Sequence, residues 1–143
     1  MNFPVYVSLV VIGSDEQETK TGLLKIGDNF SLAGARLNQG EGSLDIISEL
    51  IKTYVGDVDP NLFFVNRAGF LDDPDRYKDA EQDVVLVYRI TVPLHTSLNN
   101  GMEWMSAAFC NDNRKYFLKD HFNIINMALD YGQIINRRTK TIH

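Results

Sequence analysis

Three acidic side chains recur at four-residue intervals in the first half of the chain: Glu41, Asp45 and Glu49. If this segment is helical, Asp45 and Glu49 share one face. Carboxylates on one face are suitable oxygen ligands for Mg²⁺ or Mn²⁺. The same spacing is typical of a solvated helix face, with Asp45 favoured in the first turn by the helix dipole. The sequence favours this second interpretation.

Three arginines, Arg36, Arg67 and Arg76, are candidates for binding an anion, because a planar guanidinium group can hold a phosphate through two hydrogen bonds. Arg76 follows Asp73 and Asp75, so pairing with one of these acids is an equally good interpretation.

Two of the three histidines and the single cysteine are further candidates for chemistry. His95 belongs to a single His-x-Ser motif, which predicts a surface histidine because gripping a phosphate from both sides needs a second such motif. Cys110 is the only cysteine and has no histidine base in its sequence context, so it is a poor candidate nucleophile. For His121 the sequence favours packing against the sheet over a place in a ligand pocket.

The apolar pattern predicts six strands and two helices in the order β-β-β-α-β-β-β-α. This order is typical of an α/β fold, a single-domain α/β/α sandwich spanning residues 1–143, with a mixed β-sheet between two helical layers. The expected strands are Val5–Ile12, Gly22–Ile26, Ser31–Leu37, Leu62–Leu71, Asp83–Val92 and Glu103–Phe109; the helices are Leu44–Tyr54 and about Asp120–Arg137.

Helical spacing of apolar residues predicts the buried side of the first helix. The stripe consists of Leu44, Ile47, Leu50, Ile51 and Tyr54, with Ser43 as the expected N-cap. Gly56 is expected to end this helix.

The stretch from Gly34 to Gly56 resembles the Nudix box, G-x5-E-x7-R-E-U-x-E-E-x-G-U, where U is apolar. In an ungapped register Ala35 takes the opening glycine position, while Glu41, Ile51 and Gly56 match. The segments Gly69–Arg76, Val84–Pro93 and Asp120–His121 are similar to the branch that handles ADP-ribose and includes NAD-metabolism regulators. The resemblance therefore implies a Nudix fold over most of the chain.

The core of the box departs from the family pattern. Glu49 stands at the arginine position, and Leu50, Thr53 and Tyr54 stand at the three glutamate positions. The family uses such glutamates to hold Mg²⁺ or Mn²⁺ against a diphosphate, so the resemblance implies a degenerate member without a standard metal site. If the chain were active, Glu41, Asp45 and Glu49 would be its replacement catalytic and metal-binding residues, with Mg²⁺ as the cofactor.

These features predict a protein that binds a nucleoside-diphosphate derivative, related to ADP-ribose or NAD, or a protein partner. It would act as a sensor, regulator or accessory subunit. The alternative is a Mg²⁺-dependent Nudix hydrolase that cleaves a nucleoside diphosphate linked to another moiety. Arg36, Arg67 and Arg76 are the expected ligand-binding residues. The resemblance implies that their cleft lies between the first helix, the strand Leu62–Leu71 and the loop 72–82.

Composition bounds the remaining possibilities. The net charge of −5 argues against a general nucleic-acid coat or a binder of anionic membranes, and no direct contact with nucleic acid is expected. No apolar run approaches the ~20 residues of a membrane span, and the single cysteine fits a reducing compartment, so the default expectation is a cytoplasmic protein. A homodimer is compatible with the sequence.

Overall fold

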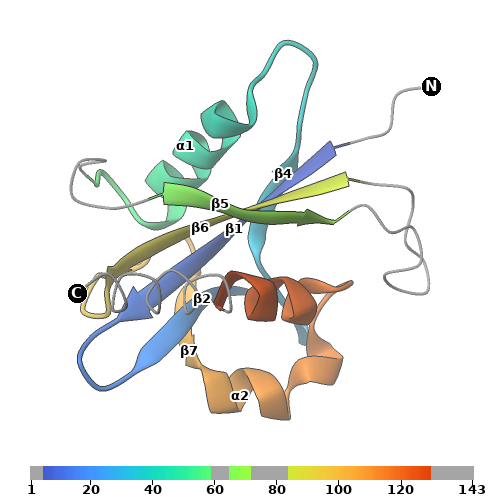
Figure 1. The fold of residues 1–143 in the computed structure, drawn as a ribbon. Coiled ribbons are helices and arrows are strands. Elements are labelled where there is room, and N and C mark those ends of the chain that lie inside the picture. The colour runs from blue at the N-terminus through green and yellow to red at the C-terminus, as the bar shows by residue number, and fades with distance from the viewer. Residues whose placement is uncertain (1–4, 59–64, 72–83, 130–143) are drawn as a thin grey trace, which may run out of the picture.

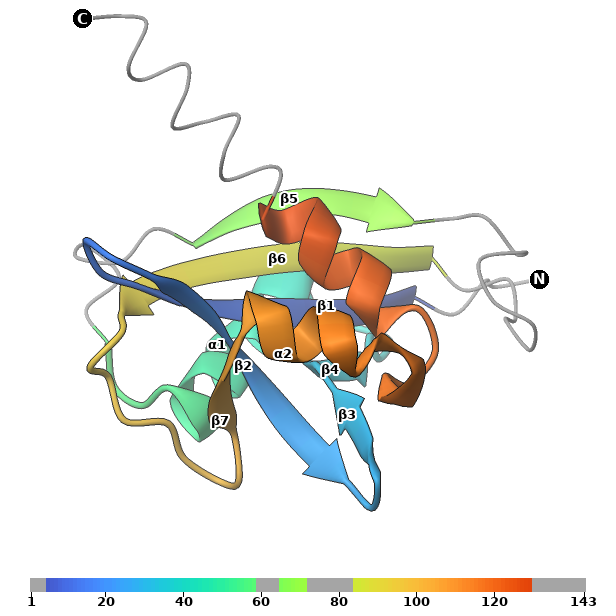
Figure 2. The same ribbon diagram turned by 90° about the horizontal axis from the view of Figure 1, so that it is seen from below.

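The computed structural model describes residues 5–58, 65–71 and 84–129 of the chain. A seven-stranded mixed sheet forms its centre, and helices cover both faces (Figures 1 and 2). This arrangement confirms the predicted α/β/α sandwich. The strands are β1 (Val5–Ser14), β2 (Thr19–Ile26), β3 (Asn29–Ser31), β4 (Ala33–Arg36), β5 (Val65–Leu71), β6 (Val84–Pro93) and β7 (Glu103–Ser106).

The central strand β1 organises the sheet. It pairs in parallel with β6 along its whole length, from Val5 opposite Val84 to Ser14 opposite Pro93. On its other side it pairs antiparallel with β4 at one end and with β2 at the other. Strand β5 pairs with β6, whereas β3 and β7 both pair with β2.

Alternation along β1 divides the buried residues into two cores, because successive side chains of a strand point to opposite faces. Val7, Leu9 and Val11 pack on the face covered by α1 (Ser43–Tyr54). Val10 and Ile12 pack on the other face. There, α2 (Ala107–Asp112) and the helical residues 121–129 cover the sheet, as Figure 1 shows below the strands.

The predicted helix at 44–54 is present, but its buried stripe is rotated from the predicted one. Ile46, Ile47 and Ile51 are buried, whereas Leu44 is 63% exposed in the first turn. Leu50 and Tyr54 are half-buried and pack against the α1-side core. The prediction for Leu44 was wrong, because Ile46 and not Leu44 packs into the α1-side core.

One predicted strand, Ser31–Leu37, is interrupted at Leu32, which separates β3 from β4. A break in a strand leaves backbone groups to be satisfied by other partners. The Leu32 N–H donates to Nδ1 of His121 at 3.1 Å, and the Ser31 hydroxyl donates to the Leu32 carbonyl at 2.9 Å. The local sequence pattern did not reveal this break, because the acceptor of the Leu32 N–H, His121, is distant in the sequence.

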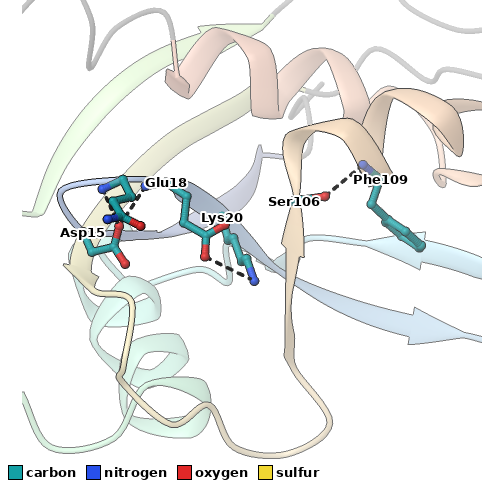
Figure 3. Close-up of polar contacts among 6 residues, drawn as sticks. Asp15, Glu18, Lys20, Ser106 and Phe109 are labelled. Carbon is teal, nitrogen blue, oxygen red and sulfur yellow. Dashed lines mark hydrogen bonds and ion pairs between the residues drawn. The ribbon is translucent and has the colours of Figure 1, made fainter.

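A second predicted strand, Glu103–Phe109, is a strand only as far as Ser106. The Ser106 side chain accepts a hydrogen bond from the Phe109 N–H at 3.1 Å and caps the start of α2 (Figure 3). Serine is a favoured N-cap residue, and Ala107–Ala108 then continue as helix.

The turn between β1 and β2 is also closed by a side chain. The Asp15 carboxylate accepts hydrogen bonds from the N–H groups of Gln17 and Glu18, both at 2.8 Å (Figure 3). These bonds, the one from Glu18 first, lower the pKa of Asp15. Glu18 also pairs with Lys20 at 3.7 Å.

The helical segment 121–129 is fixed at both ends. His121 bonds to Leu32 at its start, and the Arg89 guanidinium donates to the Ala128 carbonyl at 3.0 Å near its end. The remainder of the predicted second helix, residues 130–137, lies outside the described residues.

Candidate functional site

The segment that resembles the Nudix box runs from β4 through a loop into α1. Gly42 is the N-cap of α1, and its N–H donates to the Asp45 carboxylate at 3.0 Å. The Glu41 carboxylate accepts a bond from the Asn38 N–H at 3.3 Å within the loop. Both predicted acids are therefore engaged with the backbone of their own segment.

The outer face of α1 presents few side chains that could ligate a metal ion. Glu49 is exposed, and its backbone carbonyl accepts a hydrogen bond from the Thr53 hydroxyl at 2.8 Å. Leu50 and Tyr54, at two of the glutamate positions of the box, pack against the core instead. In residues 5–58, 65–71 and 84–129, no three His, Cys, Asp or Glu side chains are grouped so that they could hold one metal ion.

A hydroxyl pair joins the first turn of α1 to the sheet. Ser43 lies inside this turn and is not its N-cap, contrary to the prediction, and its Oγ is 2.7 Å from the hydroxyl of the buried Tyr88 in β6. The backbone register places Arg67 of β5 opposite Tyr88, and the ladder then shifts between Arg67 and Gly69.

The end of α1 is held by the loop between β6 and β7, which sequence analysis left without a role. The Asn99 N–H donates to the Tyr54 carbonyl at 2.8 Å, and the Asn100 side chain donates to the Thr53 carbonyl. Asn100 adopts a φ of 54°, a left-handed conformation that asparagine tolerates better than most residues. Gly56, with a φ of 103°, ends the helix as predicted.

Arg36 lies on the face of the sheet opposite α1. It pairs in register with Tyr6, and Tyr6 packs against the core formed with residues 121–129. The neighbouring Ala35 packs against the α1-side core. Since cross-strand partners share a face, the Arg36 side chain extends on the Tyr6 side and not toward the predicted cleft beside α1.

Of the other candidate residues, His95, Cys110 and His121 lie in the described part of the chain. His95 is exposed on a loop. Cys110 is buried, and burial raises its thiol pKa, which disfavours the reactive thiolate. His121 is buried, and its pKa is lowered to about 4, chiefly by burial, with Asp120 opposing this shift. Arg76 and the loop 72–82 lie outside the described residues, so the prediction for Arg76 stays a prediction.

Comparison with known proteins identifies the fold. No protein-family model matches the sequence, and no curated protein is similar to it. Among solved structures, the Nudix domain of Shewanella oneidensis NrtR, complexed with ADP ribose, is similar at a TM-score of 0.71 and 14% identity, covering 91% of this chain and 88% of that one. The C-terminal domain of mouse MUTYH, complexed with human PCNA, gives a TM-score of 0.71 at 10% identity, covering 92% and 91%.

A bifunctional NMN adenylyltransferase/ADP ribose pyrophosphatase from Francisella tularensis, complexed with AMP and a Mn ion, is also similar. Its TM-score is 0.67 at 19% identity, covering 90% of this chain and 42% of that one. Likenesses of this kind define the class of architecture: the chain has the Nudix fold, as the box segment predicted.

Within the described part of the chain, no helix combines the length and the apolar character that crossing a membrane requires.

Proposed function

We propose that this chain is a Nudix-fold binding protein, a sensor, regulator or accessory subunit, that has lost metal-dependent catalysis. Its ligand is a nucleoside-diphosphate derivative of the ADP-ribose or NAD kind. The supporting observation is the set of contacts that the side chains of α1 make. Where the family pattern has glutamates, Leu50 and Tyr54 pack against the core and Thr53 bonds to the helix backbone.

The acids that remain on α1 support the same proposal. The Asp45 carboxylate caps its own helix, and the Glu41 carboxylate holds the preceding loop. Turning either carboxylate away from its own segment toward a cation would give up a backbone hydrogen bond, whose net contribution is roughly 0.5–1.5 kcal/mol. A diphosphate near α1 then meets less carboxylate repulsion and can be bound by arginines directly.

Among the predicted arginines, the backbone register of β5 supports Arg67 for this role. Its register partner, Tyr88, is the residue that bonds to Ser43 in the first turn of α1. We therefore propose that Arg67, together with Arg76, contacts the diphosphate. Arg36, on the other face, does not contribute to this α1-side contact.

Structures of the same fold have ligands of the proposed kinds. The NrtR domain was solved with ADP ribose, and the MUTYH domain was solved with a protein, PCNA. NrtR itself was also solved with a 27mer DNA, in a longer chain of which this one covers 59%. A protein partner therefore stays part of the proposal beside the small molecule.

Calorimetric titration with ADP-ribose, NAD and dinucleotides tests the proposal. We expect a dissociation constant in the micromolar range and a loss of roughly 1.5–3 kcal/mol in the Arg67→Ala variant, the size of a hydrogen bond to a charged group. Arg114→Ala, an exposed arginine remote in sequence, is the control and should bind like the parent. Absence of binding to every nucleotide would leave the protein-partner function in its place.

A further inference from the structure

The loop between β6 and β7 contains the only Asn-Gly pair of the sequence, Asn100-Gly101. Both residues are exposed, and the loop passes the C-terminal end of α1 (Figure 2). In such a pair the backbone nitrogen of the glycine can attack the side-chain amide carbon of the asparagine, because glycine has no Cβ to hinder the approach. The pair is therefore a candidate for deamidation, a covalent modification that changes the charge of the chain.

The surroundings of Gly101 leave its backbone nitrogen accessible. A Cβ at Gly101 would meet no atom within 4 Å beyond the two neighbouring residues, so nothing crowds this position. In the described part of the chain the Gly101 N–H donates to no acceptor. The turn is closed instead by the Met102 N–H, which donates to the Asn99 carbonyl at 3.1 Å. The Gly101 nitrogen can therefore approach the Asn100 side chain without breaking a hydrogen bond of its own.

The side chain of Asn100 holds this loop against α1. Its amide NH₂ group donates to the Thr53 carbonyl in the last turn of the helix. A carbonyl oxygen only accepts hydrogen bonds, so this contact needs the amide protons of Asn100. An ionised carboxylate at position 100 has no proton to donate. Its negative charge would also lie beside the C-terminal end of α1, where the helix dipole disfavours an anion.

From these observations we infer that Asn100 is a deamidation site, and that its modification releases the loop 94–102 from the end of α1. The reaction converts a side chain that donates to Thr53 into one that repels the same carbonyl. The backbone bond from the Asn99 N–H to the Tyr54 carbonyl is then the hydrogen bond left at this contact among the described residues. The inference does not depend on the proposed function, since it involves neither Arg67 nor a bound nucleotide.

The chemistry needs water and no other reactant. The Gly101 nitrogen gives up its proton to the solvent and bonds to Cγ of Asn100, and the former amide nitrogen leaves as ammonia, which gives a cyclic imide. Water then adds to one of the two imide carbonyl carbons and the C–N bond at that carbon breaks. The product is aspartate or isoaspartate at position 100. In total one water is consumed and one carboxylate and one ammonium ion are formed, without oxidation or reduction.

Peptide mass mapping of the full chain, kept folded in mildly alkaline buffer, tests the reaction. Asn113 is the matched control within the same molecule, because its side-chain amide also donates to a carbonyl at a helix end, that of Phe109 at 2.9 Å, but Arg114 follows it. Asn100 should convert at least about ten-fold faster than Asn113, since a side chain on the attacking residue raises the barrier. Equal rates, or conversion of Asn100 only in urea-unfolded protein, would overturn the inference.

Asn100→Asp reproduces one product and tests the release of the loop. It should lower the melting temperature by roughly 2–8 °C, because the donor to Thr53 is lost and a negative charge is added at the helix end. Asn99→Asp is the matched control, since it adds the same charge at the adjacent exposed position, whose contact with α1 is made by the backbone N–H. It should lower the melting temperature by less than half as much. Equal melting of Asn100→Asp and the parent, or equal losses in the two variants, would contradict the release.

Discussion

A buried neutral histidine joins the last described helix to the break between β3 and β4. Nδ1 of His121 accepts the Leu32 N–H, so the imidazole must be unprotonated at that nitrogen. Burial lowers its pKa from 6.5 to about 4, which means that the native state resists protonation where the unfolded chain accepts it. The stability that this residue contributes is therefore complete above pH 6.5 and is lost as the pH falls toward 4.

We expect the free energy of unfolding to fall by up to roughly 3 kcal/mol between pH 6.5 and 4 on account of His121. His121→Asn keeps an acceptor near the position of Nδ1 but does not titrate, so this part of the pH dependence should vanish. His121→Ala leaves the Leu32 N–H unpaired and should cost about 1–3 kcal/mol at pH 7. Urea unfolding across this pH range measures all three; identical pH profiles for the parent and His121→Asn would contradict the assignment.

At the scale of elements, hydrogen bonds to other parts of the chain hold both ends of α1. Its start is bonded to Tyr88 and capped by Asp45, and its last carbonyls are met by Asn99 and Asn100. The helix and its end at Gly56 were predictable from apolar spacing and one glycine. The contacts from 99 and 100 were not, because they join residues more than forty positions apart.

Substitutions of Asp45 and Glu49 test whether Asp45 caps the helix or whether the two carboxylates share a metal ion. Asp45→Ala should destabilise the protein by about 1 kcal/mol through loss of the bond to the Gly42 N–H, whereas Glu49→Ala, at an exposed position, should change stability by less than about 0.5 kcal/mol. Neither effect should depend on Mg²⁺. Thermal unfolding with and without Mg²⁺ is the measurement, and stabilisation of the parent by Mg²⁺ that both variants abolish would instead indicate shared coordination.

For the whole molecule, the order of the elements read from the apolar pattern, together with the box segment, was enough to predict the sandwich. Two of the local errors, the ends of predicted strands at Leu32 and at Ala107, arose where a side chain supplied a bond that pattern alone does not reveal: His121 in one case, Ser106 in the other. The placement of Arg36 was also beyond the sequence, because a strand's facing depends on its register with Tyr6. With a net charge of −5, the molecule repels anions at long range, so binding of a diphosphate must depend on local cations and should weaken at high salt.

The central claim is that α1 no longer holds a metal, so that ligand binding does not need one. Calorimetric titration of the parent protein with ADP-ribose, once in millimolar MgCl2 and once in EDTA, tests this most directly, with the ligand recovered and analysed afterwards. We predict the same dissociation constant in both buffers and an intact ligand. Binding that appears only with Mg²⁺, together with cleavage of the diphosphate, would contradict the account and establish the hydrolase alternative.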